Sequence, residues 1–346
     1  MTERKIYLDY LRVFSMLIVI ASHITGGYNF YNTDIRSAAW QTFNIYESLT
    51  RWGVPVFVMI SGALFIGRGI PVRRLYGKYI LRLAAAYFFW NIIYSVIAGG
   101  GITDHITGII SGHYHMWFIP MIAGLYICVP LLDKIAESEK LTKYFLLISF
   151  IFAFAVPQVI SMISDFAGSR AALLASSVNS VLQNMHINFV LGYAFYFMLG
   201  YYFDRKALPQ AVKRSAAVCG ICAFIATALL SAALTFKTGT AQSAYYDNFT
   251  VNVMAESVFV FLLFRHAKFK NGTKCAKAAC LLSGFSFGAY LVHALVHEQL
   301  YGIFGLDTLS FIPALSVPAI SILVSLISYA ISALINQIPF AKKYIV

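Results

Sequence analysis

The sequence predicts an all-α protein that crosses a membrane about ten times, with both termini in the cytoplasm. Of its 346 residues, 60% are hydrophobic and 16% aromatic, whereas only 12% are charged. Ordinary soluble domains carry about twice that share of charged residues, so the composition excludes a chain of soluble domains. We expect a single transmembrane domain, residues 1–346, in the inner (cytoplasmic) membrane.

Ten apolar stretches are long enough to cross about 30 Å of hydrocarbon. They run over residues 8–29, 52–67, 79–98, 115–132, 143–164, 186–203, 214–236, 249–264, 280–301 and 312–338. The fourth is the least regular, because Pro120 and Pro130 are expected to interrupt it. The segment 165–187 has apolar residues near helical spacing, which suits a short helix on the outer interface.

The distribution of cations predicts how these helices are oriented. With the N-terminus inside, the cytoplasmic segments hold 20 of the 26 lysines and arginines. Arg12 and Arg82 fall in or near the membrane, and the other four cations lie outside: Arg36, Arg51, Arg170 and Lys237. Cytoplasmic loops of membrane proteins are enriched in Lys and Arg. Topology therefore explains the net charge of +12, and we expect no nucleic-acid partner.

Ionisable residues in the first stretch are the strongest functional signal. Asp9, Arg12 and His23 share one helix face, with Arg12 and His23 roughly 16 Å apart along the axis. Such groups cost several kcal/mol in a bilayer unless they are paired or face water. Asp9 and Arg12 can pair with each other as a structural ion pair. A neutral His23 suits a general base acting on a hydroxyl, and a hydrogen-bonded packing histidine is the alternative.

A second basic set opens the third stretch. Arg74, Lys78 and Arg82 recur every four residues, which places them on one face of a helix at its cytoplasmic end. A row of cations of this kind binds anions well. Anchoring at the membrane interface explains Arg74 equally well, but it explains Arg82 poorly, because Arg82 lies a turn inside the apolar run.

Histidines gather before the fourth stretch and on the ninth. With their neighbours these residues are His113, His115 and Trp117, then Tyr290, His293, His297 and Glu298. Histidine and tryptophan are also ordinary residues at a membrane interface. His293 and His297 have the spacing of a metal-binding pair, but no cysteine or third histidine is near in sequence, so no metal site is predicted. Glu256, in the middle of the eighth stretch, is a lone signal that would be protonated or paired if buried.

Six motifs resemble one known family. The opening YLDYLRVFSMLIVIASH is similar to that of the acyltransferase 3 family, ten-helix membrane acyltransferases whose mark is a basic residue, ten residues and a histidine. Arg12 and His23 fit this mark. The further motifs follow in order as VPVFVMISGALF, GKYILRLAAAYFFW, HMWFIPMIAGLYICVPLL, FMLGYYF and SFGAYLVHALV. Within the family, the chain most resembles surface-polysaccharide O-acetyltransferases of the enterobacterial-common-antigen type.

This resemblance implies a membrane O-acetyltransferase. Such an enzyme moves an acyl group from cytoplasmic acetyl-CoA to a hydroxyl of an extracytoplasmic glycan or glycolipid, with no permanently bound cofactor. The resemblance makes His23 the essential residue, Arg12 its orienting or donor-binding partner and Arg82 the basic residue of the third helix. Four further residues fall on family motifs without an assigned role, as candidates for the substrate side: Ser61, His115, Trp117 and His293.

A mechanism follows from this chemistry. Alcoholysis of a thioester needs a base for the hydroxyl and a cation or dipole near the developing oxyanion. We expect CoA phosphates at Arg74, Lys78 and Arg82, and the acetyl group near His23. An acetyl-histidine intermediate is the mechanistic alternative. A transporter of a small polar solute such as an amino acid is the competing function, because intramembrane ionisable residues also form proton relays; the absence of a recognisable inverted repeat disfavours it.

Overall fold

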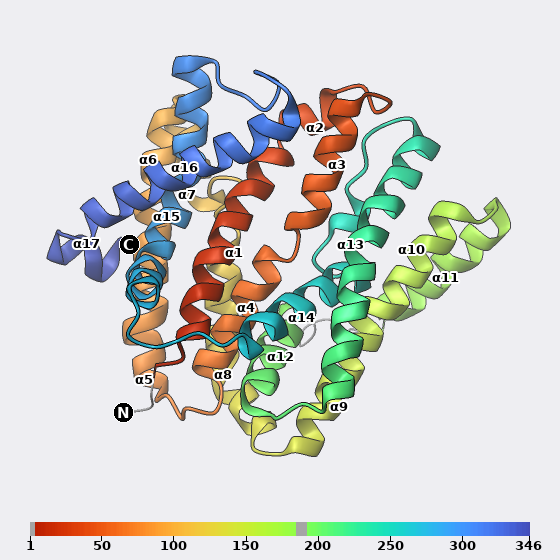
Figure 1. Cartoon of the computed structure of the whole chain (residues 1–346), viewed down its shortest axis with the longest axis horizontal. Coiled ribbons are helices and arrows are strands. Elements are labelled where there is room, and N and C mark those ends of the chain that lie inside the picture. The colour runs from red at the N-terminus through yellow and green to blue at the C-terminus, as the bar shows by residue number, and fades with distance from the viewer. Residues whose placement is uncertain (1–3, 185–191) are drawn as a thin grey trace.

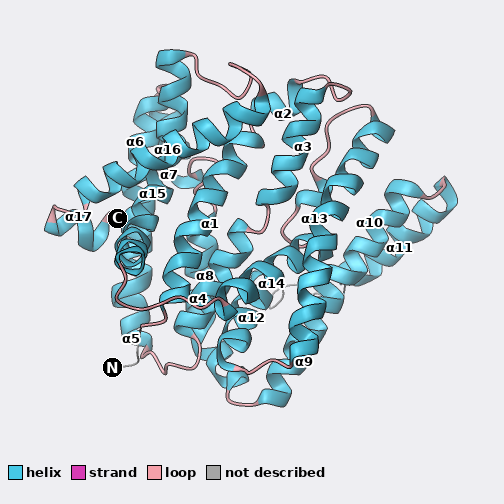
Figure 2. Cartoon of the chain, viewed as in Figure 1, coloured by secondary structure: helices cyan, strands magenta, loops and turns pink. Residues whose placement is uncertain are grey.

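The computed structural model describes residues 4–184 and 192–346, and this part of the chain contains helices and no strand (Figures 1 and 2). The helical elements follow one another as α1 (Ile6–Thr25), α2 (Tyr28–Asn32), α3 (Ala38–Thr50), α4 (Gly53–Phe65), α5 (Val72–Arg74), the π-helix η1 (Leu75–Ile80), α6 (Leu81–Ala98), α7 (Ile102–Ser111), α8 (Phe118–Ala136), α9 (Glu139–Ser149), the π-helix η2 (Phe150–Ala155), α10 (Val156–Phe166), α11 (Ser169–Asn184), α12 (Tyr193–Arg205), α13 (Gln210–Thr238), the 3₁₀-helix η4 (Ala244–Tyr246), α14 (Val251–His266), α15 (Lys274–Phe304), α16 (Pro313–Ile335) and α17 (Pro339–Tyr344). The all-α class is confirmed.

Within the described residues, nine helical segments are long and apolar enough to cross a membrane. They run over Ile6–Asn32, Ala38–Phe65, Val72–Ala98, Phe118–Ala136, Glu139–Phe166, Gln210–Thr238, Ala244–His266, Lys274–Phe304 and Pro313–Ile335. Each overlaps one of the predicted stretches. In the remaining predicted stretch, 186–203, residues 186–191 lie outside the described part of the chain. Helix α12 covers residues 193–203. The chain is a multi-pass membrane protein, whereas the cytoplasmic placement of its termini stays a prediction.

Three local expectations change in detail. The second segment begins at Ala38, whereas the predicted apolar stretch begins at residue 52. The predicted start is late because α3 buries polar side chains, which lower the hydropathy of this part of the sequence. Helix α8, which corresponds to the fourth predicted stretch, is unbroken. Pro120 lies in its first turn, where a backbone N–H would have no partner within the helix, and Pro130 is tolerated inside it. The helix predicted in the segment 165–187 forms as α11, although residues 185–187 lie outside the described part, and its position at the outer interface stays a prediction.

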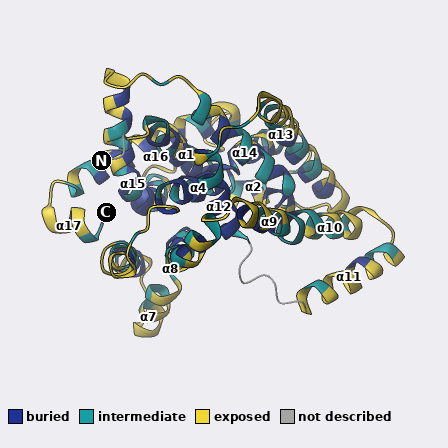
Figure 3. Cartoon of the chain, turned by 90° about the horizontal axis from the view of Figure 1, so that it is seen from below, coloured by how far each residue is buried: buried dark blue, intermediate teal, exposed yellow. Residues whose placement is uncertain are grey.

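Helix α1 runs through the interior of the bundle. It packs against α15, α16, α4, α3 and α14, which come from both halves of the sequence. Figure 3 shows the buried residues gathered around α1, α4 and α14, while α7 and α11 at the periphery are mostly exposed. The ionisable residues of α1, Asp9, Arg12 and His23, are therefore surrounded by protein on several sides.

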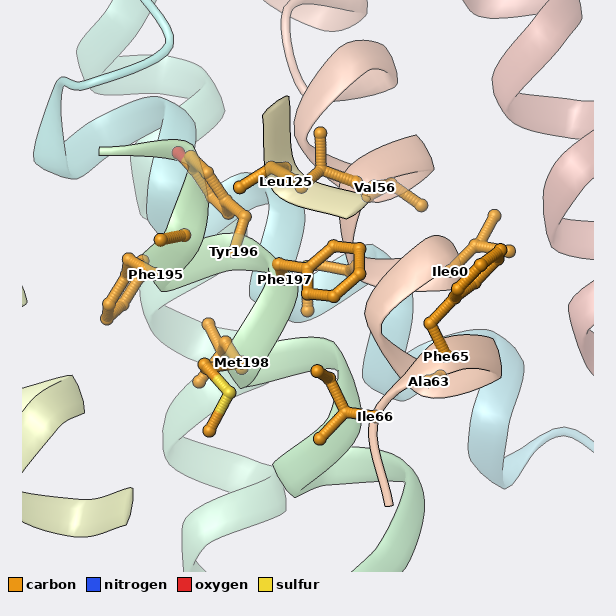
Figure 4. Close-up of a cluster of buried hydrophobic side chains, with 14 of the residues drawn as sticks. Val56, Ile60, Ala63, Phe65, Ile66, Leu125, Phe195, Tyr196, Phe197 and Met198 are labelled. Carbon is orange, nitrogen blue, oxygen red and sulfur yellow. The ribbon is translucent and has the colours of Figure 1, made fainter. Parts of the chain in front are cut away.

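Helices α4 and α12 approach each other closely at two glycines. A Cβ atom on Gly62 would overlap the carbonyl group of Phe197, and a Cβ on Gly200 would overlap that of Met59. Small residues let backbones approach in membrane bundles, where van der Waals packing drives association. Phe197 and Met198 then pack with Val56 and Ile60 in the buried cluster of Figure 4.

A single methyl group at this contact is expected to destabilise the fold. Gly200→Ala forces α4 and α12 apart, at a cost of about 1–3 kcal/mol. We expect a lower Tm for the variant in thermal unfolding of the detergent-purified protein. Gly302→Ala is the matched control, because a Cβ there meets no atom within 4 Å. An unchanged Tm in Gly200→Ala would show that the helix pair tolerates separation.

Candidate active site

Arg12 and His23 both lie on α1 and line the same cavity, as their shared helix face predicts. The apolar run of α1 continues without Gly or Pro to its C-terminal cap at Gly26, whose N–H bonds to the carbonyl of Ser22. The cavity has a volume of about 430 Å³, and we name it the Arg12 cavity. Its polar lining includes Arg12, His23, Ser61, Arg82, His115 and Tyr126.

Asp9 does not pair with Arg12, so the ion pair expected from their spacing is wrong. Arg4 reaches back from the segment before α1 and donates two hydrogen bonds to the Asp9 carboxylate, at 2.7 and 2.8 Å. Arg12 instead donates to the hydroxyl of Ser283 on α15, at 3.2 Å. Among the described residues, Arg12 has no carboxylate within ion-pair distance, and its charge is free to face an anion in the cavity.

The basic row of the third segment is divided by the structure. Residues 75–80 form a π-helix, whose bonds span five residues, so the regular four-residue spacing assumed for the row does not hold. Arg82 lines the Arg12 cavity and donates to the main-chain oxygen of Val346. Its guanidinium lies 5.5 Å from the ring centre of Phe287. Arg74 and Lys78 are exposed and are not part of the cavity lining.

A second cavity of about 710 Å³ begins where the first ends. We name it the Arg51 cavity, and its polar and aromatic lining includes Tyr31, Arg51, Tyr114, Asp247, Asn248 and Glu298. His23, Val54 and Trp117 line both cavities. Within the described part of the chain the side chain of His23 makes no hydrogen bond, so its ring is available to ligands where the two cavities meet.

Arg51 lines this cavity, although its place in the sequence predicts only an ordinary cation outside the membrane. It forms an ion pair with the carboxylate of Glu47 one turn earlier, and its guanidinium lies 5.0 Å from the ring centre of Tyr246. The Glu47 side chain is fully buried. The i, i+4 spacing of this acid and base was a visible signal, but it lay in a segment that the sequence analysis left outside the apolar stretches.

Three imidazoles form the centre of the site. The ring centres of His23 and His293 are 5.1 Å apart, those of His115 and His293 are 4.9 Å apart, and those of His23 and His115 are 6.5 Å apart. His115 and His293 are each only 1% exposed. Three segments far apart in the sequence, α1, the turn before α8, and α15, therefore bring one histidine each to the same place.

The remaining candidates divide between the cavities and the core. Ser61 lines the Arg12 cavity and donates to the carbonyl of Phe57 at 3.0 Å. Trp117 lines both cavities. Glu256 lines neither; it accepts a hydrogen bond of 2.5 Å from Thr227 in a polar contact between α13 and α14. Across the described residues, no three His, Cys, Asp or Glu side chains are arranged to hold a metal ion.

The family model described as an acyltransferase domain, that of the acyltransferase 3 family, matches residues 5–335 of this chain. The match covers α1 to α16, and thus all the helices that build the two cavities. No curated protein and no solved structure matches the chain. Nearly the whole chain is covered by that one match, and the protein therefore belongs to the acyltransferase 3 family as a membrane acyltransferase.

Proposed function

We propose that this protein is an O-acetyltransferase that moves the acetyl group of acetyl-CoA to a hydroxyl of an extracytoplasmic glycan or glycolipid, with His23 as general base. The observation that carries the proposal is the position of His23, which lines both the Arg12 cavity and the Arg51 cavity. A transfer reaction needs a point at which donor and acceptor meet, and this ring provides one for two substrates that arrive from different sides.

The Arg12 cavity has the properties of a donor site. Neither Arg12 nor Arg82 forms an ion pair with an Asp or Glu side chain among the described residues, and the Nε of Arg82 is buried without a hydrogen-bond partner, although its Nη2 donates to the main-chain oxygen of Val346. Two such cations favour a polyanion such as the phosphates of CoA. Phe57, Phe65 and Phe287 supply apolar walls for the pantetheine arm and the thioester. Arg74 and Lys78 are exposed and would meet the nucleotide outside the cavity.

The Arg51 cavity has the properties of an acceptor site. Tyr31, Tyr114 and Trp117 offer flat apolar faces, which pack on the ring of a sugar. Asp247 and Asn248 offer a carboxylate and an amide, which bond hydroxyl groups. With the N-terminus in the cytoplasm, as the cation distribution predicts, this cavity faces the outer side of the membrane.

The reaction at His23 is a direct transfer. The acceptor oxygen attacks the thioester carbonyl while a ring nitrogen of His23 takes the hydroxyl proton, so a C–O bond forms and the C–S bond breaks. The CoA thiolate then takes that proton from His23, which returns the base to its starting form. Arg12 lies roughly 16 Å from His23 along α1, so its role in this scheme is to bind the donor and not to orient the base.

Loss of the base is expected to abolish transfer without affecting the fold. His23→Ala should lower kcat for acetyl transfer by roughly 10²- to 10⁴-fold, because general-base catalysis contributes about that factor. Acetyl-CoA binding and Tm should stay close to those of the parent protein. His266→Ala is the matched control, since His266 lines neither cavity. Near-normal turnover in His23→Ala would remove His23 from the mechanism and the proposal with it.

Donor binding is expected to depend on Arg82 more than on Arg74. Arg82→Ala removes a cavity cation and should raise the KM for acetyl-CoA about 10-fold or more, the effect of losing a charged hydrogen bond. Arg74→Ala should change KM less than about threefold, because an exposed cation is screened by salt and water. Steady-state kinetics gives the two KM values, and isothermal titration with CoA gives the affinity of each variant for the donor. Equal affinities in Arg82→Ala and the parent would return Arg82 to a structural role.

The two cavities predict that donor and acceptor act from opposite sides of the membrane. In right-side-out vesicles, acetyl-CoA sealed inside should support acetylation of surface glycan added outside, read by mass spectrometry as a gain of one acetyl group. Acetyl-CoA added outside should give no product, because its charged nucleotide cannot cross the bilayer. Equal product from external acetyl-CoA would mean that both substrates enter through one mouth.

A further inference from the structure

A chain of hydrogen bonds leads from the Arg51 cavity to the three imidazoles and is not used by the scheme above. The Oε1 atom of Glu298 lies 3.1 Å from Nε2 of His113. The Nδ1 atom of His113 lies 2.9 Å from Nδ1 of His115. The ring of His113 is held between these partners by stacking on Tyr94 on α6, with ring centres 4.2 Å apart. An exposed carboxylate is thus joined to a histidine that is only 1% exposed.

With His113 and His115 neutral, the donors and acceptors in this chain fix which nitrogen of His115 carries a proton. An ionised carboxylate only accepts, so Nε2 of His113 must be the protonated nitrogen. A neutral imidazole has one N–H, which leaves Nδ1 of His113 as an acceptor for the Nδ1–H of His115. The Nε2 atom of His115 is then a lone pair, and it is buried without a hydrogen-bond partner.

The same reasoning applies to His293 by an independent contact. Its Nδ1 lies 2.6 Å from the carbonyl oxygen of Tyr290, one turn earlier on α15. A carbonyl oxygen only accepts, so this Nδ1 is protonated and Nε2 is a lone pair. That Nε2 atom is also buried without a partner. The centre of the site therefore presents two unsatisfied acceptors beside His23.

Two lone pairs cannot bond each other, so the site requires donors. A neutral His23 has one N–H, and it gains a second when it takes the proton of the attacking hydroxyl. We propose that His115 and His293 stabilise the imidazolium that forms on His23 during transfer, and that Glu298 and His113 are positioning residues that fix the tautomer of His115. This inference rests on the proposed role of His23 as general base.

The arrangement favours the transition state over the ground state. The rings of His115 and His293 lie beside the ring of His23, and their unpaired Nε2 lone pairs interact more favourably with an imidazolium than with a neutral ring. Interactions that are stronger in the transition state than in the ground state raise kcat. A carboxylate behind an imidazole supports a base in this way in serine hydrolases, where it holds the tautomer without itself being protonated. Here two imidazoles, His113 and His115, stand between the carboxylate and the base.

The first experiment measures the tautomers directly and needs no substrate. The probe is the ¹⁵N NMR spectrum of the full-length protein labelled with ¹⁵N-histidine in lipid nanodiscs, assigned by single histidine substitutions. We expect His115 and His293 to be protonated at Nδ1 and unprotonated at Nε2. Glu298→Ala should convert His115 to a mixture of tautomers and leave His293 unchanged. A proton on Nε2 of His115 in the parent protein would overturn the inference.

The second experiment compares two substitutions of His113. A glutamine side chain has an amide donor and an oxygen acceptor, so His113→Gln retains both contacts of the chain, whereas His113→Leu retains neither. At saturating acceptor, His113→Leu should lose about 10- to 100-fold in kcat with the KM for acetyl-CoA unchanged. His113→Gln should recover most of that loss. Equal losses in the two variants, or full kcat in His113→Leu, would contradict the positioning role.

Glu298→Ala should show the same separation of kcat from the KM for acetyl-CoA as His113→Leu. Glu137→Ala is its control, because Glu137 is an exposed carboxylate paired only with Lys134, outside both cavities. The outcomes also separate this inference from the proposed function. Full activity in His23→Ala refutes the function and leaves the NMR result standing. An inactive His23→Ala variant together with the wrong His115 tautomer refutes only the inference.

Discussion

The burial of a polar helix is the constraint on which the rest of this structure depends. α1 carries an arginine and a histidine within its apolar run, and such groups are costly in contact with lipid. They are accommodated because five other helices pack around α1 and provide cavities on its polar face. Helices α15 and α16 from the C-terminal part of the sequence pack on α1 together with α3, α4 and α14.

The close contact of α4 and α12 helps to fix the position of α4, which lines both cavities. Val54, at the start of α4, lines both cavities, and Ser61, two turns later, lines the Arg12 cavity. Gly62 follows Ser61 directly and fixes how closely α4 approaches α12. A helix that wraps a reaction site has to be held at a defined distance, because small displacements of reacting groups lower rates strongly. The glycines of this pair therefore belong to the architecture of the site, although they lie outside its lining.

Much of the fold and part of the site could be predicted from sequence. Hydropathy located nearly every membrane segment, because about 20 apolar residues are needed to cross a bilayer. Helical periodicity placed Arg12 and His23 on one helix face, and in the structure both line one cavity. Periodicity did not reveal the π-helix at residues 75–80, since a π-bulge has no simple residue signature. Periodicity also did not reveal that Arg4, and not Arg12, pairs with Asp9. Arg4 lies before the helix begins, so helical spacing does not predict which residues its side chain contacts.

Tertiary contacts explain the other omissions. Arg51 was assigned to an external segment because Glu47 and its polar neighbours depress the hydropathy of α3, yet the pair is buried against Tyr246. The chain from Glu298 to His115 joins α15 to the turn before α8, 175 or more residues away in sequence and visible only in three dimensions. Sequence spacing predicts which residues share a helix face, but it says nothing about which faces of different helices meet.

The charges of the two cavities differ in a way that bears on their substrates. In the Arg12 cavity, neither Arg12 nor Arg82 pairs with an Asp or Glu side chain among the described residues, so their charges favour an anionic ligand. In the Arg51 cavity, the one arginine is already neutralised by Glu47, and Asp247 and Glu298 add negative charge. Bringing a phosphate into that second cavity would place it near carboxylates, which is unfavourable at close range. This difference favours a polyanionic donor on the side of Arg12 and a neutral, hydroxyl-rich acceptor on the side of Arg51. It also gives each substrate a reason to avoid the cavity of the other, so that the two meet only at His23.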